Sequence, residues 1–560
     1  MGAGAAALLL LRKASPWSVI GGAAAALLLW CAVQVLEWAW WAPRRVDRAL
    51  RAQGLSGTRY RFLWGDIKED KRLTAAALAR PVPLDRPHDV FPRAAPGLHR
   101  AIEQHGKCNS VVPPQYQPSI YVWVLISGTK YCSQENSRSH GSGRARVIIT
   151  DPEQVRDVLS NKSGDFVKTS LATRLSRVLI GGLAVLEGEK WVKHRKIMNP
   201  AFHAEKLKGM LPAFSASCSE LIDRWENLVA ASVGPAELDV FPEFQNLSGD
   251  VISRAVFGVS HQEGRRIFLL QAEQTERLVR AFRTNYIPGF SLLPTENNRR
   301  MKANDKEVKK ILRGIIEKKE KAMNNGEATQ DDLLAMLLES NMNYSDSEGK
   351  SSKGITAEEV IDECKLFYFV GMETTAVLLT WTVVLLSMHP EWQDRAREEV
   401  LQVFGQNTPD FSGINRLKTV TMVLYEVLRL YPPVVAMNRR THRRTELGGV
   451  TYPPGVMLVL PVMFIHRDPA LWGEDAGEFN PGRFAEGVSK ACKDPGAFVP
   501  FSWGPRVCIG QNFALVEAKM AVCMMLQRFA FELSPAYVHA PYTVLTLHPQ
   551  HGVPVRLRGL

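Results

Sequence analysis

The feature that most constrains the fold is a run of 32 residues, Ala357–Met388, that is mostly apolar and contains no proline. Gly371 is the only glycine in this run. A helix of this length extends about 48 Å at 1.5 Å per residue, which is enough to cross a whole domain. The run therefore predicts one long helix that crosses a large domain.

The rest of the chain shows helical patterns with a few short strand patterns between them. From Asp151, which can cap a helix that has Pro152 in its first position, the pattern is mostly helical to about residue 445. With 560 residues, of which 46% are hydrophobic and 22% are charged, the chain can form one large domain and an anchor. We therefore predict a mainly α fold with small β-sheets, in which the helix content exceeds the usual third. The expected strands are Arg144–Thr150, Met457–Leu460, Tyr542–Leu547 and Val553–Leu557.

An uncharged segment near the N-terminus has the length of a transmembrane helix. Trp17–Leu36 comprises 20 residues, which as a helix extend about 30 Å, the thickness of the hydrocarbon core of a bilayer. More basic residues follow the span than precede it, so the large C-terminal part is expected in the cytosol. We predict an anchor over residues 1–42 and one large domain over residues 43–560. The alternatives are a buried core helix and, because of the alanine-rich Ala23–Ala26, a signal peptide. The flanking residues are Arg12 and Lys13 before the span, and Trp38, Trp40, Trp41, Arg44, Arg45, Arg48 and Arg51 after it.

Cysteine spacing and net charge exclude several classes of protein. The eight cysteines are scattered, without a CxxC pair or a CxxCH sequence, which argues against a disulfide framework, structural zinc and c-type haem attachment. A reducing compartment is therefore expected. The net charge of +12 suits an anionic lipid surface or an acidic protein. Because no nucleic-acid-binding module is visible in the sequence, we expect no nucleic-acid partner.

One cysteine, Cys508, lies in a tight loop of glycine and proline. Arg506 precedes it by two residues, and the helical pattern Gln511–Phe529 follows it. The start of a helix carries a partial positive charge and unpaired N–H groups, and both are expected to lower the pKa of the Cys508 thiol. A thiolate held in this way can be the axial ligand of haem iron. The alternative is a buried structural cysteine, which is common for free thiols.

Gly371 and Thr374 lie three residues apart on one face of the predicted long helix. Glycine lets a ligand approach the backbone closely, and the Thr374 hydroxyl can replace a helical hydrogen bond and open a local bulge. Reduction of dioxygen at haem consumes protons, which a hydroxyl can deliver and a neighbouring acid can replenish. We interpret Thr374 as the alcohol of a proton relay, Glu373 as its acid and Gly371 as part of an oxygen groove. The alternative is a buried helix glycine beside capped threonines.

Two pairs at helical spacing are weaker signals. Glu426 and Arg429 lie three residues apart on the helical run Thr419–Leu430, where a carboxylate–guanidinium pair forms readily. Trp191 and Arg195 are four residues apart and share one helix face. Either pair alone carries little information, because each also suits an ordinary helix surface.

Together these motifs resemble those of the cytochrome P450 superfamily, whose haem loop reads F-x-x-G-x-R-x-C-x-G. The segment Val370–Thr375 resembles the superfamily pattern A/G-G-x-D/E-T-T/S, except that Val370 replaces the usual alanine or glycine. Phe479–Phe484 resembles its P-x-R-F element. The residues that match the haem loop are Phe501, Gly504, Arg506, Cys508 and Gly510.

This resemblance implies a haem-thiolate monooxygenase domain that holds haem b with iron bound by Cys508. It implies that Arg195, assisted by Trp191, binds a haem propionate, and that either Arg439 or Arg440 is a further propionate partner. It also implies that Arg483 joins Glu426 and Arg429 in a buried salt-bridge network that is structural. The remaining residues expected at the haem are Phe501, Arg506 and Gly510.

Three stretches resemble the plant family 72 branch, which includes secologanin synthase: Gln53–Tyr60, Asn199–His203 and Phe367–Thr375. Members of this branch oxidise terpenoids, steroids, gibberellin-type diterpenes or herbicides, and the resemblance implies the endoplasmic reticulum membrane. We expect a lipophilic small-molecule substrate, because the candidate pocket residues are mostly apolar. These candidates are residues 170–186, Phe369, Met372, residues 434–437 and residues 544–545.

The expected electron donor is a separate protein. The chain has no G-x-G-x-x-G sequence followed by a dinucleotide-binding domain, so electrons must come from an NADPH-dependent cytochrome reductase. The basic residues Lys193, His194 and Lys196 beside Arg195 suit docking of an acidic flavoprotein through complementary charge.

One stretch, residues 107–143, does not fit the family, which crosses this region with a short β-hairpin. We interpret it either as an ordered insertion with Tyr121–Ile126 as the hairpin strand or as an artefact of the gene model.

Three functions remain open from the sequence. The leading one is a monooxygenase that inserts one oxygen atom into an unactivated C–H bond. The second is a haem-thiolate isomerase or dehydratase that acts without dioxygen, and the presence of Glu373 and Thr374 argues against it. The third is a haem sensor or membrane scaffold without enzymatic activity.

Overall fold

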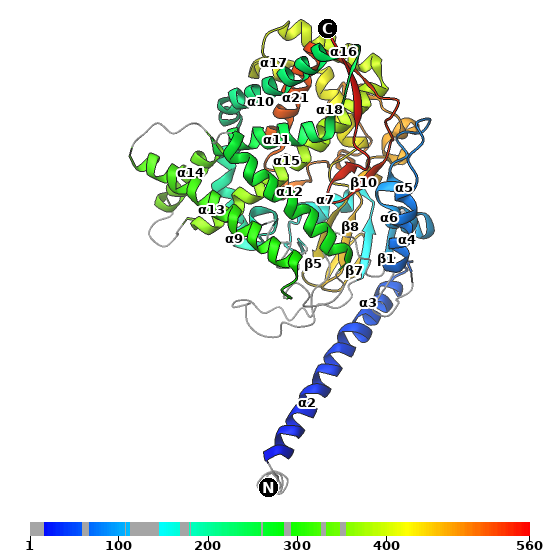
Figure 1. Cartoon of the computed structure of the whole chain (residues 1–560). Helices are drawn as coiled ribbons and strands as arrows, with labels where there is room; N and C mark the ends of the chain where they lie inside the picture. Colours follow the sequence, from blue (N-terminus) through cyan, green and yellow to red (C-terminus); the bar gives the residue numbers. More distant parts are fainter. Residues whose placement is uncertain are drawn as a thin grey trace, which may run out of the picture.

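The computed structural model confirms a mainly helical fold with small sheets (Figure 1). It describes residues 16–58, 67–106, 108–112, 145–168, 179, 181–258, 261–284, 293–325, 332–347 and 354–560.

The predicted long helix is α15, Ala357–Met388, which runs through the body of the protein (Figure 1). Its start has a reciprocal cap, in which the Thr356 side chain accepts from the backbone N–H of Glu359 and the Glu359 side chain accepts from that of Thr356. Within the described part of the chain, α15 is the one helix long and apolar enough to cross a membrane, yet most of it is buried in the protein core. Its apolar composition therefore reflects burial on all sides.

Three helices pack around α15 and position the site. These are α11, Val240–Phe257, α18, Thr419–Leu430, and α21, Gln511–Arg528. The bounds of α18 are those predicted from the sequence, and α21 ends one residue earlier than predicted. The other helices are α3 Ala42–Arg51, α4 Ile67–Leu78, α5 Phe91–Ala94, α6 Pro96–His105, α7 Pro152–Ser160, α9 Gly188–Met198, α10 Ala204–Ala231, α12 His261–Thr284, α13 Glu296–Asn324, α14 Leu333–Ser347, α16 Pro390–Phe404, α17 Phe411–Arg416, α19 Val462–Ile465 and α20 Pro469–Trp472.

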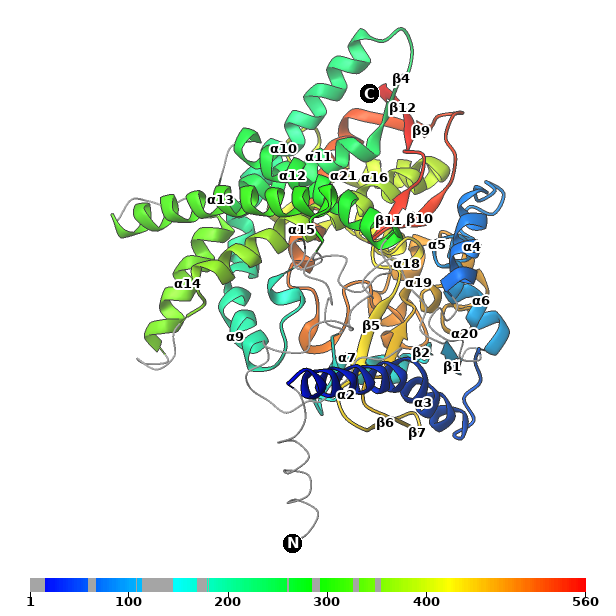
Figure 2. The same cartoon turned by 60° about the horizontal axis from the view of Figure 1, so that its bottom comes forward.

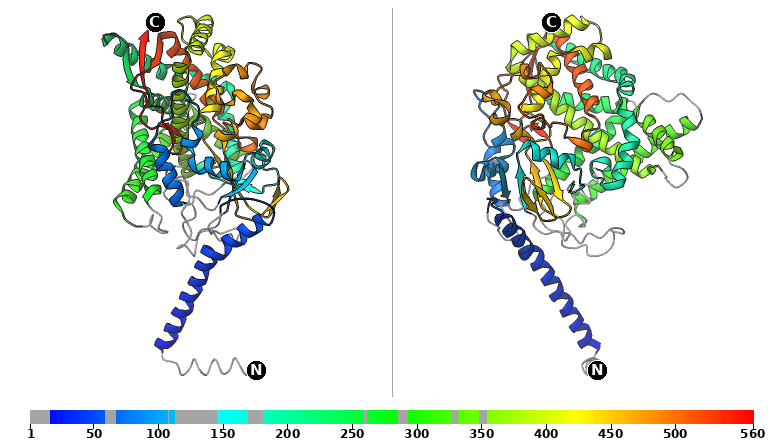
Figure 3. Two further views of the ribbon diagram at one scale, coloured as in Figure 1. Left: turned by 90° about the vertical axis from the view of Figure 1, so that its right-hand side faces the viewer. Right: turned by 180° about the vertical axis from the view of Figure 1, so that it is seen from behind.

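The N-terminal segment forms α2, Pro16–Leu36, which leaves the body as a separate rod (Figures 1 and 3). Its apolar side chains point outward, and Trp17 and Leu28 are 80% and 70% exposed. A π-helical turn, Glu37–Trp41, links α2 to α3, which joins the body through the fully buried Leu50. The exposed surface of α2 is therefore largely apolar.

The largest sheet has five strands in the order β1-β2-β8-β5-β3 and lies near the base of α2 (Figure 2). Strand β2, Arg146–Ile149, lies within the predicted strand, and Asp151 caps the following helix by accepting from the N–H of Gln154. Strand β1, Cys108–Val112, lies inside the atypical stretch 107–143 and pairs antiparallel with β2. Residues 113–144, including the expected strand Tyr121–Ile126, lie outside the described residues. The remaining strands of this sheet are β3 Phe166–Val167, β5 Met437–Thr441 and β8 Met457–Leu460.

The C-terminal region differs from the sequence-based expectation at one point. The run Tyr542–Leu547 alternates like a single strand, but it forms two strands, β10, Pro541–Thr543, and β11, Leu547–Pro549. A turn closed by the Val544 N–H and the Thr546 carbonyl reverses the chain between them. The other strands are β4 Ala236–Asp239, β6 Thr445–Leu447, β7 Val450–Tyr452, β9 Phe529–Leu533 and β12 Pro554–Gly559, and β12 contains most of the predicted strand Val553–Leu557.

Candidate active site

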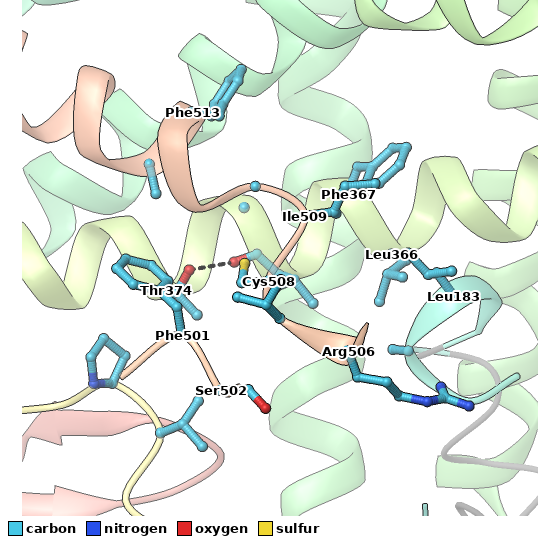
Figure 4. Close-up of a pocket in the computed structure, with 18 of the residues that line it drawn as sticks. Leu183, Leu366, Phe367, Thr374, Phe501, Ser502, Arg506, Cys508, Ile509 and Phe513 are labelled. Carbon is cyan, nitrogen blue, oxygen red and sulfur yellow. Dashed lines mark hydrogen bonds between the residues drawn. The ribbon is translucent and has the colours of Figure 1, made fainter. Parts of the chain in front are cut away.

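A cavity of about 310 Å³ lies between α15 and the loop that carries Cys508 (Figure 4). Thr374 lines it from α15, and Phe501, Arg506 and Cys508 line it from the loop. The other lining residues are mainly apolar and come from α11, α15, α18, α19, β5, the segment before β5 and the start of α21. They include Ile252, Val256, Leu366, Phe367, Leu378, Leu428, Val434, Met437, Val462 and Phe513.

The backbone of the Cys508 loop is held tightly beneath this cavity. The Cys508 N–H donates to the Phe501 carbonyl over 2.9 Å. Gly504 has φ +70°, and a Cβ atom there would lie 2.9 Å from the carbonyl oxygen of Leu159 at the end of α7. The loop therefore needs glycine at this position both for its conformation and for its close approach to α7.

The Cys508 side chain is enclosed by the protein but exposes its surface to the cavity. Burial raises the pKa of its thiol above the ordinary value, although the Gly510 N–H, Arg195 and Lys168 act to lower it. The prediction of a lowered thiol pKa is therefore wrong for the protein alone, because desolvation of the thiolate exceeds these attractions. A bound metal cation reverses this balance, since a coordinating thiol is deprotonated outright.

Gly371 and Thr374 both line the cavity from α15. The Thr374 Oγ1 donates to the carbonyl oxygen of Val370 over 2.9 Å, but α15 continues as an α-helix without the expected bulge. A Cβ atom at Gly371 would lie 2.5 Å from Cδ1 of Ile252, so this glycine also permits close packing of α11 on α15. Val370 is 37% exposed in an otherwise buried stretch, and its side chain narrows the same cavity.

Glu373 is 4% exposed and is not among the residues that line the cavity. Its Oε1 accepts a hydrogen bond of 2.7 Å from the hydroxyl of Thr546 and another from Nε2 of His548. Burial acts to raise the pKa of Glu373, but the hydrogen bond and charge of His548 and the bond from Thr546 together lower it below its ordinary value. Glu373 is therefore a buried carboxylate directed at the C-terminal hairpin.

The structure brings Glu426, Arg429 and Arg483 together in the core. Arg429 donates to both carboxylate oxygens of Glu426 over 2.7 Å, and Arg483 Nε donates to Oε1 over 3.2 Å. Arg429 also donates to three backbone carbonyls, and Glu426 accepts from the Asn480 N–H over 2.9 Å. Because Glu426 and Arg429 are both fully buried, this network holds the chain before the Cys508 loop in one conformation.

A cluster of four cationic side chains lies beside the Cys508 loop: Lys168, Arg195, Arg439 and Arg506. Burial and the charges of Arg439 and Arg506 lower the pKa of Lys168 to about 7, and burial and Arg506 lower the pKa of Arg439 to about 10. Among the described residues, Glu187 is the carboxylate paired with this cluster, through Arg506. Four basic side chains beside one carboxylate leave an excess of positive charge. A ligand that brings further carboxylates, such as haem with its two propionates, suits this cluster. The residues present therefore fit the expected cofactor.

The structure shows the surroundings of three residues that were predicted to lie at the haem propionates. Arg195 donates to the Val507 carbonyl over 2.9 Å, and the Trp191 ring lies 4.3 Å from the guanidinium of Arg506. Arg439 is buried on the face of β5 that meets the cluster, and consecutive strand residues point to opposite faces. The geometry thus favours Arg439 over Arg440 as the partner of a propionate.

Sequence reasoning missed Lys168, Thr546 and His548. Lys168 belongs to no motif, and only the fold brings it to the cavity. His548 has no partner at motif spacing in the sequence, because Glu373 is 175 residues away. The signal that could have revealed it is the pairing of two polar residues, Thr546 and His548, at spacing two in an otherwise apolar segment.

The predicted pocket residues are only partly in the cavity wall. Val434 and Met437 line it, whereas Phe369 packs in a separate apolar cluster with Leu179 and Leu278. Part of the predicted loop, residues 170–178, lies outside the described residues.

Comparison with known proteins agrees with this geometry. The chain is 56% identical to cytochrome P450 CYP72A616 of Paris polyphylla, over 96% of this chain and 99% of the relative. It is 46% identical to secologanin synthase 2 of Catharanthus roseus, over 94% of each protein. Its fold is similar to that of retinoic acid-bound cyanobacterial CYP120A1, with a TM-score of 0.68 at 21% identity over 84% of this chain and 96% of that chain.

The family model described as cytochrome P450 matches residues 132–550. Because this match and the relatives both cover most of the chain, the protein belongs to the cytochrome P450 superfamily of haem-thiolate monooxygenases and is a family 72-like member.

Proposed function

We propose that this protein is a membrane-anchored monooxygenase that hydroxylates a lipophilic terpenoid or a steroid- or hormone-like plant metabolite. The observation that carries the proposal is that Cys508 and Thr374, from two different elements, line one mainly apolar cavity. Secologanin synthase 2 is among the relatives, which supports a terpenoid as the class of substrate.

Haem b supplies activation of dioxygen when it is bound, with Cys508 as the thiolate ligand of its iron. Arg195, Arg439 and Arg506 would hold its propionates, with Trp191 packed on Arg506. The loop residues Phe501 and Gly510 would enclose the sulfur. Gly371 lines the cavity as the proposed oxygen groove, with Ile252 packed where a Cβ atom would lie, and the apolar walls orient the substrate and exclude water. Thr374 holds a proton on Oγ1 at the cavity wall, and Glu373 is the acid that restores it.

Removing the Thr374 hydroxyl together with its methyl group tests this proton delivery. In Thr374→Ala we expect product per NADPH to fall by on the order of tenfold or more, and hydrogen peroxide release to rise, because general acid catalysis contributes about 10²–10⁴-fold. Thr380→Ala is a matched control, since Thr380 on the same helix also donates to the carbonyl four residues earlier but does not line the cavity. Equal coupling in the two variants would remove Thr374 from the relay.

Measuring haem affinity shows which of the two arginines of β5, Arg439 or Arg440, binds a propionate. We expect Arg439→Gln to retain less haem than the unmodified protein during dilution or gel filtration, because a cation of the cluster is lost. Arg440→Gln should retain haem normally, since its side chain points to the other face of β5. Haem per polypeptide, measured from the absorbance of the purified proteins, decides between them. The reverse ranking would assign the propionate contact to Arg440.

We further propose that α2 anchors the protein in the endoplasmic reticulum membrane, with the catalytic domain in the cytosol. The supporting features are the exposed apolar surface of α2 and the arginines that follow it. An NADPH-cytochrome reductase is the proposed electron donor. The basic face of α9 that would meet it is smaller than the sequence suggested, because His194 is 1% exposed and bonds Glu363 over 2.6 Å. Lys196 is exposed on the same helix.

The alternative function is a haem-thiolate isomerase or dehydratase that acts without dioxygen. NADPH-dependent oxygen uptake with a panel of terpenoid and steroid candidates separates the two. A product that forms at the same rate without oxygen and NADPH would overturn the monooxygenase proposal.

A further inference from the structure

The acid of the proposed relay does not face the cavity that it is meant to serve. Thr374 lines the cavity, whereas the Glu373 carboxylate contacts the hairpin formed by β10 and β11. Consecutive residues on a helix are about 100° apart, so the two side chains leave α15 in different directions. If Glu373 supplies the proton for Thr374, that proton has to come from the side of the helix where Glu373 meets this hairpin.

The hairpin is anchored in a way that places two polar side chains at Glu373. The Leu547 carbonyl accepts from Nε1 of Trp381 over 2.8 Å, and the Leu547 N–H donates to the Pro433 carbonyl over 3.1 Å. With Leu547 fixed between them, Thr546 and His548 both reach Oε1 of Glu373. The turn between β10 and β11 thus creates the contact.

His548 links this buried carboxylate to the surface. The His548 side chain is 14% exposed, whereas that of Glu373 is 6% exposed. Its ring is packed against Phe241, with centroids 5.1 Å apart, and against Tyr542 at 6.1 Å. Among the described residues, Glu373 on α15 is the carboxylate that His548 contacts, and Tyr542 on β10 is the other titratable group against its ring. A polar path therefore leads from solvent through His548 to Glu373, with apolar rings beside it.

We propose that His548 is the outer member of the proton relay, a positioning residue that holds Glu373 and passes it protons from solvent. The Nε2–H bond of protonated His548 breaks and an O–H bond forms on Oε1 of Glu373, leaving a neutral imidazole and a neutral carboxyl. The neutral carboxyl, no longer attracted to a cation, rotates about its side-chain bonds and gives its proton to Oγ1 of Thr374, which has passed its own proton into the cavity. The vacated Nε2 of the imidazole then takes a proton from a hydronium ion, which becomes water.

This inference rests on the proposed monooxygenase function and names the source of its protons. It also explains why Glu373 is held as a carboxylate in the resting protein, since the hydrogen bonds from His548 and Thr546 lower its pKa despite burial.

The test is His548→Gln, which keeps an N–H donor for Glu373 but cannot exchange a proton. Its control is His551→Gln, three residues further along on an exposed turn. We expect His548→Gln to keep a normal haem content and to lose at least about tenfold in product per NADPH, with peroxide release rising. We expect His551→Gln to behave like the unmodified protein.

Two further readouts exclude a merely structural role. The dependence of the rate on pH should differ between the unmodified protein and His548→Gln, because glutamine cannot exchange a proton at this position. A structural role would lower the rate by the same factor at every pH. Infrared difference spectra of His548→Gln should also show the band of a protonated carboxyl at neutral pH, because the buried Glu373 has lost its cationic partner. The band should be absent in the double variant that also carries Glu373→Gln.

If His548→Gln formed the normal amount of product per NADPH, and its rate depended on pH as in the unmodified protein, the inference would be overturned. The monooxygenase proposal would remain intact. Failure of the monooxygenase proposal is recognised separately, as product formation at the same rate without oxygen and NADPH.

Discussion

Cys508→Ser is expected to abolish monooxygenase activity and the thiolate-type absorption band that forms when the reduced protein binds carbon monoxide. Cys508 is the cysteine that exposes its side chain to the cavity, and its neighbours Arg195 and Lys168 favour the thiolate. A serine hydroxyl stays protonated at neutral pH, so it cannot supply the same anionic ligand. The measurement is the reduced carbon monoxide difference spectrum of membranes or purified protein, together with haem per polypeptide.

Cys492→Ser is the matched control for this substitution. Cys492 is a half-buried free thiol in the same region, donates to the Asp494 carbonyl over 3.1 Å, and is not part of the cavity wall. It should keep the full spectrum and activity. Retention of the thiolate band in Cys508→Ser, or its loss in Cys492→Ser, would show that the ligand is assigned to the wrong residue.

Glu426→Gln is expected to cause the largest loss of stability. The substitution removes the negative charge that Arg429 and Arg483 share, and Arg429 is fully buried. An unpaired buried charge costs about 3–5 kcal/mol, a large part of the total stability of about 5–15 kcal/mol of an ordinary domain. We expect a lower denaturant midpoint followed by tryptophan fluorescence, and a lower yield of haem-loaded protein.

Glu478→Gln distinguishes the charge of this network from its backbone contacts. The carbonyl of Glu478 accepts from Arg429 over 2.9 Å, but its side chain is exposed. This variant should unfold at the same midpoint as the unmodified protein. If Glu426→Gln and Glu478→Gln had the same denaturant midpoint, the buried ion pair would contribute little to stability. The hydrogen bonds from Arg429 to the backbone would then be the main contribution of this network.

Several elements could be predicted because their signals are local. The helix α15 was visible in an apolar run without proline, and α18 and α21 were visible from periodicity and flanking turn residues. The Cys508 loop was visible because a fixed spacing of glycine, arginine and cysteine within ten residues is rare by chance. These features depend on neighbours in the chain, which the sequence displays directly.

Features that depend on residues distant in the chain were missed or misread. The thiol pKa of Cys508 was expected to fall from the helix start alone, but desolvation by the surrounding protein raises it. The strand expected at Tyr542–Leu547 turns back on itself, because Leu547 bonds Trp381 and Pro433. The pKa of a group and the path of a turn depend on the combined influence of side chains that only the folded chain brings together.

By itself the sequence determined the long central helix, the thiol-bearing loop and the family, since each is written in contiguous residues. Only the tertiary structure decided that Lys168 joins three arginines beside that loop and that Glu373 faces His548 instead of the cavity. The physical reason is that charge, desolvation and hydrogen bonding act through space. Residues 175 positions apart in the chain can thus be partners in a single hydrogen bond.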